Sequence, residues 1–341
     1  MLALAASGGS RRWSQATSFT LWLGFTLMIG LRDQVGGDWF NYLPYFDRQV
    51  GQPFSFVSQS DEVGYAIANW LAAHLDWGIY GTNTICAAIF SAGLVAFCRR
   101  QPLPWLAVTL AFPYLIVVVA MGYTRQGVAI GLEMLALLAL ERGRVVIYIV
   151  WLTIAATFHK TALVMLLLPA ITLSGSFRFV NLLRLGFLLG AGWGLFNSLL
   201  SDSVETLQSG YLDAGYQSQG ALIRVALCLL PALVFLLLRN RFPLTKQQRS
   251  IWTVMSLLAL AAVAGLVLSP SSTAVDRVSL YLIPLQLFVG SRLPDLRPFS
   301  LSPSGWNQLI ILLGFAVLSV WLLFAKNAFG WLPYRNLLLP F

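Results

Sequence analysis

A series of long apolar runs, separated by short charged segments, constrains this chain more than any other feature of its sequence. About twenty apolar residues cross a bilayer as a helix, and roughly ten or eleven such runs are present, several of them short. Hydrophobic residues make up 58% of the 341 residues and charged residues only 10%, which excludes a soluble globule of this size. Strand alternation is absent, so helices satisfy the backbone. The sequence predicts an all-α polytopic membrane protein with about 10–12 transmembrane or half-spanning helices.

The basic residues predict how these helices are oriented. Arg11 and Arg12 precede the first apolar run without a cleavage site after it, so we expect a retained helix with its N-terminus in the cytoplasm. The net charge of +9 then reflects cytoplasmic loops and gives no reason to expect nucleic acid as a partner. We expect a single membrane domain with a first helix over 14–31, an external loop and interfacial amphipathic helix over 32–78, a helical bundle over 79–325, and a tail over 326–341.

Two segments test this topology. Residues 61–77 are helical in pattern and are expected to lie in the external interface; the alternative, a full span, would invert the local orientation. Residues 201–220 follow an expected helix over 185–200 and contain acidic but no basic residues, so they are expected to be external. The three cysteines, Cys86, Cys98 and Cys228, lie in or at the ends of apolar runs without metal-site spacing, which is typical of small core residues.

The segment from Gly122 to Lys160 combines apolar helices with ionisable residues at their ends. Arg125 begins an apolar run that ends at a basic turn, and a second run returns to His159 and Lys160. A helical hairpin of these lengths brings Arg125 and His159 to the same membrane surface. Glu133, about two turns into the first helix, is expected to pair with a neighbouring helix rather than to act in catalysis.

Several cations lie where the topology disfavours positive charge. An ionised Arg at helix depth costs about 2.5–3.5 kcal/mol, so it usually has a partner or a task. The simple interpretation is snorkelling, or pairing with Asp38, Asp47, Glu62 or Asp276. As a set, the cations suit a diphosphate at the membrane surface, because guanidinium groups bind phosphate oxygens in pairs; transport of a soluble anion is the alternative. These cations are Arg32, Arg48, Arg125, Lys160 and Arg277.

Acid–base groups are expected on the same side. Asp38, Glu62 or Asp276 could accept a proton from a sugar hydroxyl, and His159 could do so nearer neutral pH, although it could equally be a core histidine. No acidic cluster has metal-site spacing, so no metal or other cofactor is expected. Aromatic residues near these groups could stack on sugars or belong to an interfacial belt.

Five short motifs in order resemble the EpsG family of Wzy-like polysaccharide polymerases. They span most of the chain: Gly37-Asp38 with Tyr42, Glu62 with Gly64-Tyr65, Thr124-Arg125-Gln126, Phe158-His159-Lys160-Thr161-Ala162-Leu163, and Arg277 with Tyr281. The resemblance implies polymerisation of polyprenyl-diphosphate-linked oligosaccharides at the outer face of the bacterial inner membrane, with membrane lipids and a chain-length regulator as further candidate partners.

The resemblance also implies roles for individual residues. The candidate bases are His159, Asp38 and Glu62. The candidate diphosphate ligands are Arg125, Arg277, Lys160 and Arg48. The candidate sugar contacts are Gln126, Trp39, Tyr42, Tyr123 and Tyr281.

Three other classes are weighed against a polymerase. An O-antigen ligase normally has a large external loop, which is absent here. A membrane acyltransferase would need its histidine near a cytoplasmic acyl donor, whereas His159 is expected on the outside. A flippase would need charges along a transbilayer path, and Glu133 is the only carboxylate well inside a predicted helix.

Overall fold

Helices form the regular structure of this protein. The computed structural model describes residues 2–6, 9, 11–172, 221–268, 272–298 and 301–339. In these ranges every named element is helical, and the only bridge outside helices joins Arg32 to Asn336. Among the described residues, three helices are long and apolar enough to cross a membrane: α5 (Gly78–Arg99), α12 (Lys246–Leu268) and α16 (Pro303–Phe324). The predicted all-α polytopic membrane fold is confirmed.

Most predicted helices begin and end close to their expected positions. Examples are α2 (Gln15–Gly30), α7 (Thr124–Leu140), α8 (Val145–Phe158) and α11 (Ala221–Leu238). Local chemistry fixes two starts, because the hydroxyls of Ser14 and Ser302 accept the backbone N–H groups of Thr17 and Gly305 at 3.0 and 3.1 Å. The helix expected over 185–200 and the external segment expected over 201–220 lie outside the described residues.

Three apolar runs that were expected to form continuous helices are interrupted. Residues 104–121 divide into α6 (Pro104–Ala111) and the π-helix η2 (Phe112–Ala120). The run expected over 161–173 contains the 3₁₀ helix η3 (Lys160–Leu167) and α9 (Leu168–Thr172). The run expected over 279–290 contains η5 (Leu280–Leu282) and α14 (Pro284–Gly290), and α13 (Ser272–Ser279) precedes it. Each run contains a proline close to the break, at Pro113, Pro169 or Pro284, and proline cannot donate the helical hydrogen bond.

The described chain forms two compact units. The first contains Met1–Leu135, Thr153–His159 and Gly290–Phe341, and the second contains Ala136–Leu152 and Lys160–Val289. Whether the whole chain acts as the single membrane domain expected from the sequence stays a prediction.

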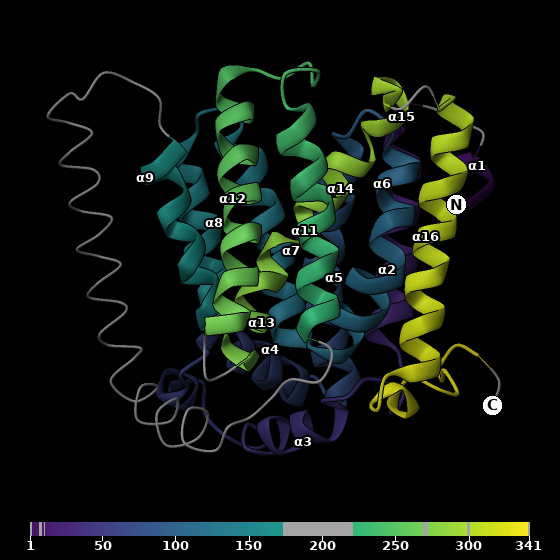
Figure 1. Cartoon of the computed structure of the whole chain (residues 1–341). Coiled ribbons are helices and arrows are strands. Elements are labelled where there is room, and N and C mark those ends of the chain that lie inside the picture. Colours follow the sequence, from purple (N-terminus) through teal and green to yellow (C-terminus); the bar gives the residue numbers. More distant parts are fainter. Residues whose placement is uncertain are drawn as a thin grey trace, which may run out of the picture. The chain divides into compact units, whose positions relative to one another are not determined.

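In the first unit, α2 packs along α5, and α16 packs beside α6 and the short helix α1 (Leu2–Ala6) (Figure 1). Helices α5 and α7 are in close contact at two glycines. A Cβ on Gly93 would lie 1.9 Å from the carbonyl oxygen of Gly131, and one on Gly131 would lie 2.7 Å from the backbone of Phe90, so neither position has room for a side chain.

A small helical layer covers one end of α5. It consists of α3 (Trp39–Asp47), η1 (Phe54–Gln59) and α4 (Val63–His74), which lie at the lower end of α5 in Figure 1. The 12 residues of α4 extend about 18 Å, which is shorter than the roughly 30 Å hydrocarbon core. Its small residues pack inward, while Ile67, Leu71 and Leu75 remain exposed along one stripe. An interfacial position is therefore favoured over a full span.

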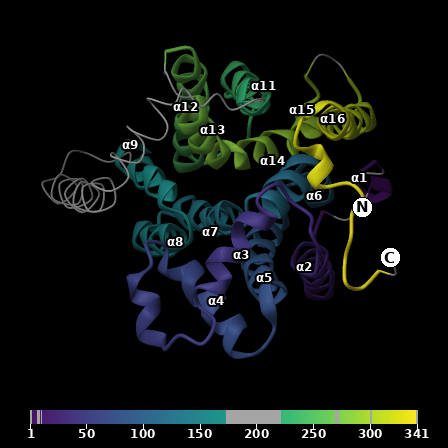
Figure 2. The ribbon, with the colours of Figure 1, turned by 90° about the horizontal axis from the view of Figure 1, so that it is seen from below.

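In the second unit, α11, α12 and α13 pack on one another, as the view from below also shows (Figure 2). The turn between α7 and α8 contains Gly143 at φ +71°, and the N–H of Arg144 returns to the carbonyl of Ala139 at 3.0 Å. Glu141 in this turn accepts a hydrogen bond from the indole N–H of Trp252 at 2.8 Å, and this bond connects α12 to the turn between α7 and α8.

Candidate functional site

A partly buried ion-pair cluster joins three distant parts of the sequence. Glu62 precedes α4, Arg125 is the second residue of α7, and His159 follows α8. One carboxylate oxygen of Glu62 accepts from the Arg125 guanidinium, and the other is 3.1 Å from His159 Nδ1. The three side chains are 13%, 26% and 14% exposed respectively. The hairpin therefore brings Arg125 and His159 to the same carboxylate.

Close packing at Gly64 makes this meeting possible. A Cβ on Gly64 would lie 2.3 Å from the hydroxyl oxygen of Thr157 and 2.9 Å from the ring of Phe158. Since only glycine lets the start of α4 approach the end of α8 so closely, Gly64 sets the distance between Glu62 and His159.

Three tyrosines surround the Arg125 guanidinium. Its central carbon lies 4.9 Å from the ring centre of Tyr45 and 5.6 and 5.8 Å from those of Tyr42 and Tyr65. We call Tyr42, Tyr45 and Tyr65 the tyrosine cluster. Cations are attracted to aromatic ring faces, so the cluster and Glu62 together hold Arg125 in one place.

The electrostatics of the cluster keep Glu62 ionised. Burial acts to raise the pKa of Glu62, but its hydrogen bond with His159 and the positive charge of Arg125 outweigh burial, so the pKa is lowered. An ionised carboxylate can only accept, so His159 donates its Nδ1–H and its Nε2 is left as an acceptor in the neutral ring. Nε2 is buried and has no hydrogen-bond partner among the described residues.

Other predicted residues of the first unit lie in the same helical layer or beside it. Asp38 accepts a hydrogen bond from Asn41 at 3.2 Å, and Arg48 lies 5.8 Å from the centre of the Tyr45 ring. Trp39 and Gln126 are buried, and Tyr123 is half-buried. The catalytic, diphosphate-binding and sugar-binding roles assigned to these residues stay predictions.

The comparison with protein families agrees with the motifs around this cluster. The EpsG family model matches residues 16–336, nearly the whole chain. The chain belongs to the EpsG family. No curated protein and no solved structure matches it. Membership of the EpsG family, together with the apolar helices, supports a polysaccharide polymerase-like role for a membrane protein.

The remaining residues predicted from the EpsG resemblance belong to the second unit. Arg277 is exposed and Lys160 is half-buried. Tyr281 is fully buried, and its hydroxyl oxygen accepts a hydrogen bond from the hydroxyl of Thr161 at 3.2 Å. Asp276, considered as a base from the sequence, accepts hydrogen bonds from Nε and Nη2 of Arg224, one on each carboxylate oxygen.

The sequence interpretation missed three contributions. Arg32 resembled an external cation but is fully buried, with its guanidinium donating to the carbonyl of Val35 at 3.0 Å and to the hydroxyl of Thr124 at 2.8 Å. Arg224, within an apolar run, pairs with Asp276, and its position inside that run was the signal. Tyr65 had been noted only as part of a motif. Nothing in the sequence indicated that its ring contacts Arg125.

Glu133 does not show the expected partner. It is fully buried, and neither carboxylate oxygen has a hydrogen-bond partner among the described residues. The predicted pairing with a neighbouring helix is therefore wrong for the described part of the chain.

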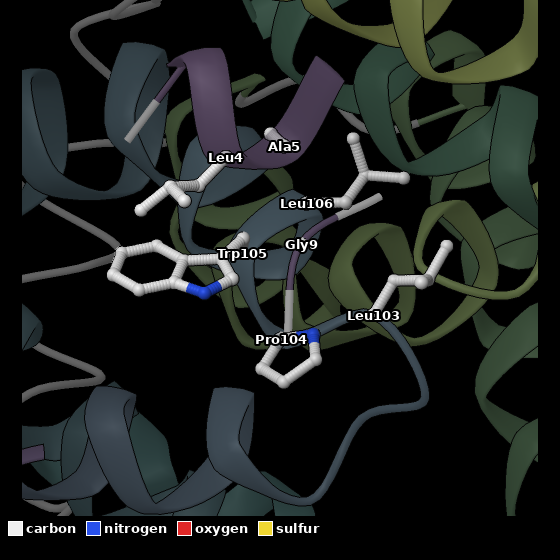
Figure 3. Close-up of a pocket in the computed structure, with 7 residues that line it drawn as sticks. All are labelled: Leu4, Ala5, Gly9, Leu103, Pro104, Trp105 and Leu106. Atoms are coloured by element: carbon white, nitrogen blue, oxygen red, sulfur yellow. The ribbon is translucent and has the colours of Figure 1, made fainter. Parts of the chain in front are cut away.

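Two other features were considered as sites. A hollow between α1 and the start of α6 is lined by Leu4, Ala5, Gly9, Leu103, Pro104, Trp105 and Leu106 (Figure 3). No ionisable side chain lines it, so it offers no acid–base chemistry. Within the described ranges, no three His, Cys, Asp or Glu side chains gather as metal ligands.

Proposed function

We propose that the protein polymerises polyprenyl-diphosphate-linked oligosaccharide repeat units at the extracytoplasmic face of a bacterial inner membrane. The product would be an exopolysaccharide, capsule or O-antigen-type glycan. The proposal combines membership of the EpsG family with the chemistry available at the Glu62–Arg125–His159 cluster.

The observation that carries the proposal is the bridging position of Glu62. The Glu62 carboxylate orients His159, the candidate base, through its contact with Nδ1, and it also holds the Arg125 guanidinium in place. A base held by a carboxylate beside a fixed guanidinium is the arrangement required when a hydroxyl attacks and an anion leaves. Of the three candidate bases, His159 is favoured because Nε2 is the acceptor without a partner among the described residues.

The proposed step is a glycosyl transfer. The acceptor sugar's hydroxyl oxygen forms a bond to the anomeric carbon of the donor, and its proton moves to His159 Nε2. The bond from that carbon to the diphosphate oxygen breaks, and the electron pair leaves with the polyprenyl diphosphate. Arg125 stabilises the negative charge as it develops, and Glu62 stabilises the imidazolium.

The other assigned residues complete the proposed site. We propose that Arg48 assists Arg125 with the diphosphate and that Trp39, Tyr42, Tyr123 and Gln126 contact sugars. The assignment of Lys160 and Arg277 to the diphosphate rests on their predicted external positions and on the family resemblance. The assignment of Tyr281 to sugars, and of a chain-length regulator as partner, rests on the family resemblance alone.

Replacement of Arg125 by alanine in cells tests this function. We expect long polymer to disappear while single lipid-linked repeats still reach the outer face. Arg100→Ala, at the exposed end of α5, is the matched control and should leave the polymer intact. Retention of repeats on the cytoplasmic side would favour a transporter, and normal polymer without transfer to a lipid A core would favour a ligase. Either result would overturn the proposal.

A further inference from the structure

The segment after α16 folds back onto the first unit. In Figure 1 this segment, residues 326–339, turns back at the lower end of α16. We call it the return segment. Its bridge between Arg32 and Asn336 is closed by two backbone hydrogen bonds, of 2.9 and 3.0 Å, between residues 31–33 and 335–337. Asn336 also donates its side-chain amide to the carbonyls of Leu27 and Met28 at 3.2 and 3.3 Å, at the end of α2.

Trp331 is the buried centre of the return segment. It is 3% exposed, and its indole N–H donates to the carbonyl of Val117 in η2 at 2.7 Å. The indole lies against two glycines: a Cβ on Gly122 would be 2.4 Å from the ring, and one on Gly37 would be 3.2 Å from it. Gly122 is three residues before Arg125 along the chain.

Gly36, the neighbour of Gly37 in the chain, packs directly on Met121 and Gly122. Gly36 has φ +115°, and a Cβ there would lie 2.2 Å from the carbonyl oxygen of Met121. The N–H of Gly36 donates to the carbonyl of Gly330 at 2.8 Å. One close-packed contact therefore joins the return segment, the loop before Asp38 and the start of α7. None of the three can shift without moving the others.

Arg32 provides a second connection to the same place. Its backbone pairs with the return segment, and its guanidinium donates to the hydroxyl of Thr124 at 2.8 Å. Thr124 is the residue immediately before Arg125. The return segment therefore reaches Gly122 through Trp331 and Thr124 through Arg32. Both residues lie within three positions of Arg125 in the chain.

We infer that the return segment positions the catalytic cluster, with Trp331 as the positioning residue that sets where α7 begins and therefore where Arg125 points. This inference rests on the proposed function for its catalytic meaning. Geometrically it depends only on the contacts of Trp331 and Arg32. Misplacement of a charged group by about 1 Å can cost on the order of 100-fold in rate, so loss of Trp331 should lower the rate of turnover in the protein that still folds.

The test compares Trp331→Ala and Trp331→Phe with Phe329→Ala. Phe329 is on the same segment but is 80% exposed, so it serves as the matched control. We expect Trp331→Ala to lower kcat for polymerisation roughly 10- to 100-fold with little change in KM. Trp331→Phe keeps most of the ring volume without the N–H and should recover part of the rate even if the alanine variant folds poorly. Turnover in folded Trp331→Ala equal to that in Phe329→Ala, or turnover in Trp331→Phe no higher than in Trp331→Ala, would overturn the inference.

Hydrogen exchange gives a second test that needs no catalytic activity. The amide of Tyr123 is bonded to the carbonyl of Val119 at 2.8 Å, so its exchange reports on the start of α7. In Trp331 variants we expect faster exchange at Gly36 and Tyr123 as well as in the return segment. Faster exchange confined to residues 326–339 would contradict the positioning role. If the wild-type protein does not polymerise, the proposed function fails while this measurement still decides the inference.

Discussion

Replacement of Glu62 by glutamine removes one charge from the centre of the cluster with little change in shape. Glutamine can still accept from His159 Nδ1, but its amide nitrogen would then face the donor groups of Arg125. The variant therefore loses the charge that stabilises the guanidinium and, in the proposed transfer, the imidazolium of His159.

The expected magnitude follows from the burial of the carboxylate. With Glu62 only 13% exposed, the bond to a charged partner contributes about 1.5–3 kcal/mol. Loss of the same amount from the transition state lowers kcat roughly 10- to 100-fold. KM should not rise, because Glu62 competes with the diphosphate for Arg125.

Stability should change with pH in a defined direction. The pKa of Glu62 is lowered from its ordinary value of 4.5 in the folded protein, because its bonds to His159 and Arg125 outweigh burial, which raises it. Its contribution is therefore complete above about pH 4.5 and is lost as the pH falls through the folded pKa. Glu62→Gln should have a lower Tm than the wild type at neutral pH, and the difference should shrink on acidification.

The assay is single-turnover polymerisation in proteoliposomes, combined with Tm measured between pH 3 and pH 7. Asp61→Asn is the matched control because it removes an adjacent, exposed carboxylate. Wild-type turnover in Glu62→Gln, with a Tm difference that does not change with pH, would refute the role given to this carboxylate.

Three further changes test the site and the packing around it. Arg125→Lys keeps the charge but loses the paired donors, so polymerisation should fall tenfold or more in the same assay. Gly131→Ala places a Cβ 2.7 Å from the backbone of α5 and should cost about 1–3 kcal/mol. Gly24→Ala, with no neighbour within 4 Å, should raise the free energy of unfolding, measured by chemical denaturation, by about 0.5–1 kcal/mol. Similar changes in stability for Gly131→Ala and Gly24→Ala would contradict the close packing of α5 and α7. Arg224→Leu should cost about 3–5 kcal/mol, and the double change with Asp276→Leu should restore most of it, because only the single change leaves a buried charge.

The sequence predicted the hairpin better than it predicted the surroundings of the cluster. The apolar runs on either side of Glu141 fix the ends of α7 and α8, so the approach of Arg125 to His159 followed from helix lengths. Glu62 was among several external carboxylates, and only the contact of Gly64 with Thr157 distinguishes it. That contact joins residues far apart in sequence and leaves no periodic pattern.

Arg32 and Trp331 show what a linear pattern cannot indicate. A cation after an apolar helix indicated an external charge, yet backbone carbonyls and the Thr124 hydroxyl satisfy Arg32 inside the protein. The polar groups that permit burial become neighbours only after folding. Nothing in the sequence indicated a role for Trp331, because its packing on Gly122 depends on where the return segment lies after folding.

The most direct test of the proposed catalytic role of the Glu62–Arg125–His159 cluster uses the two histidines of the chain. Purified protein in proteoliposomes would be given a lipid-linked repeat unit, and new glycosidic bonds and released polyprenyl diphosphate would be counted together. We predict one diphosphate released per linkage, loss of both products in His159→Gln, and wild-type yields in His74→Gln, whose ring is stacked on Trp70 at 4.6 Å. Equal yields in the two variants, or linkage without release of polyprenyl diphosphate, would contradict the account.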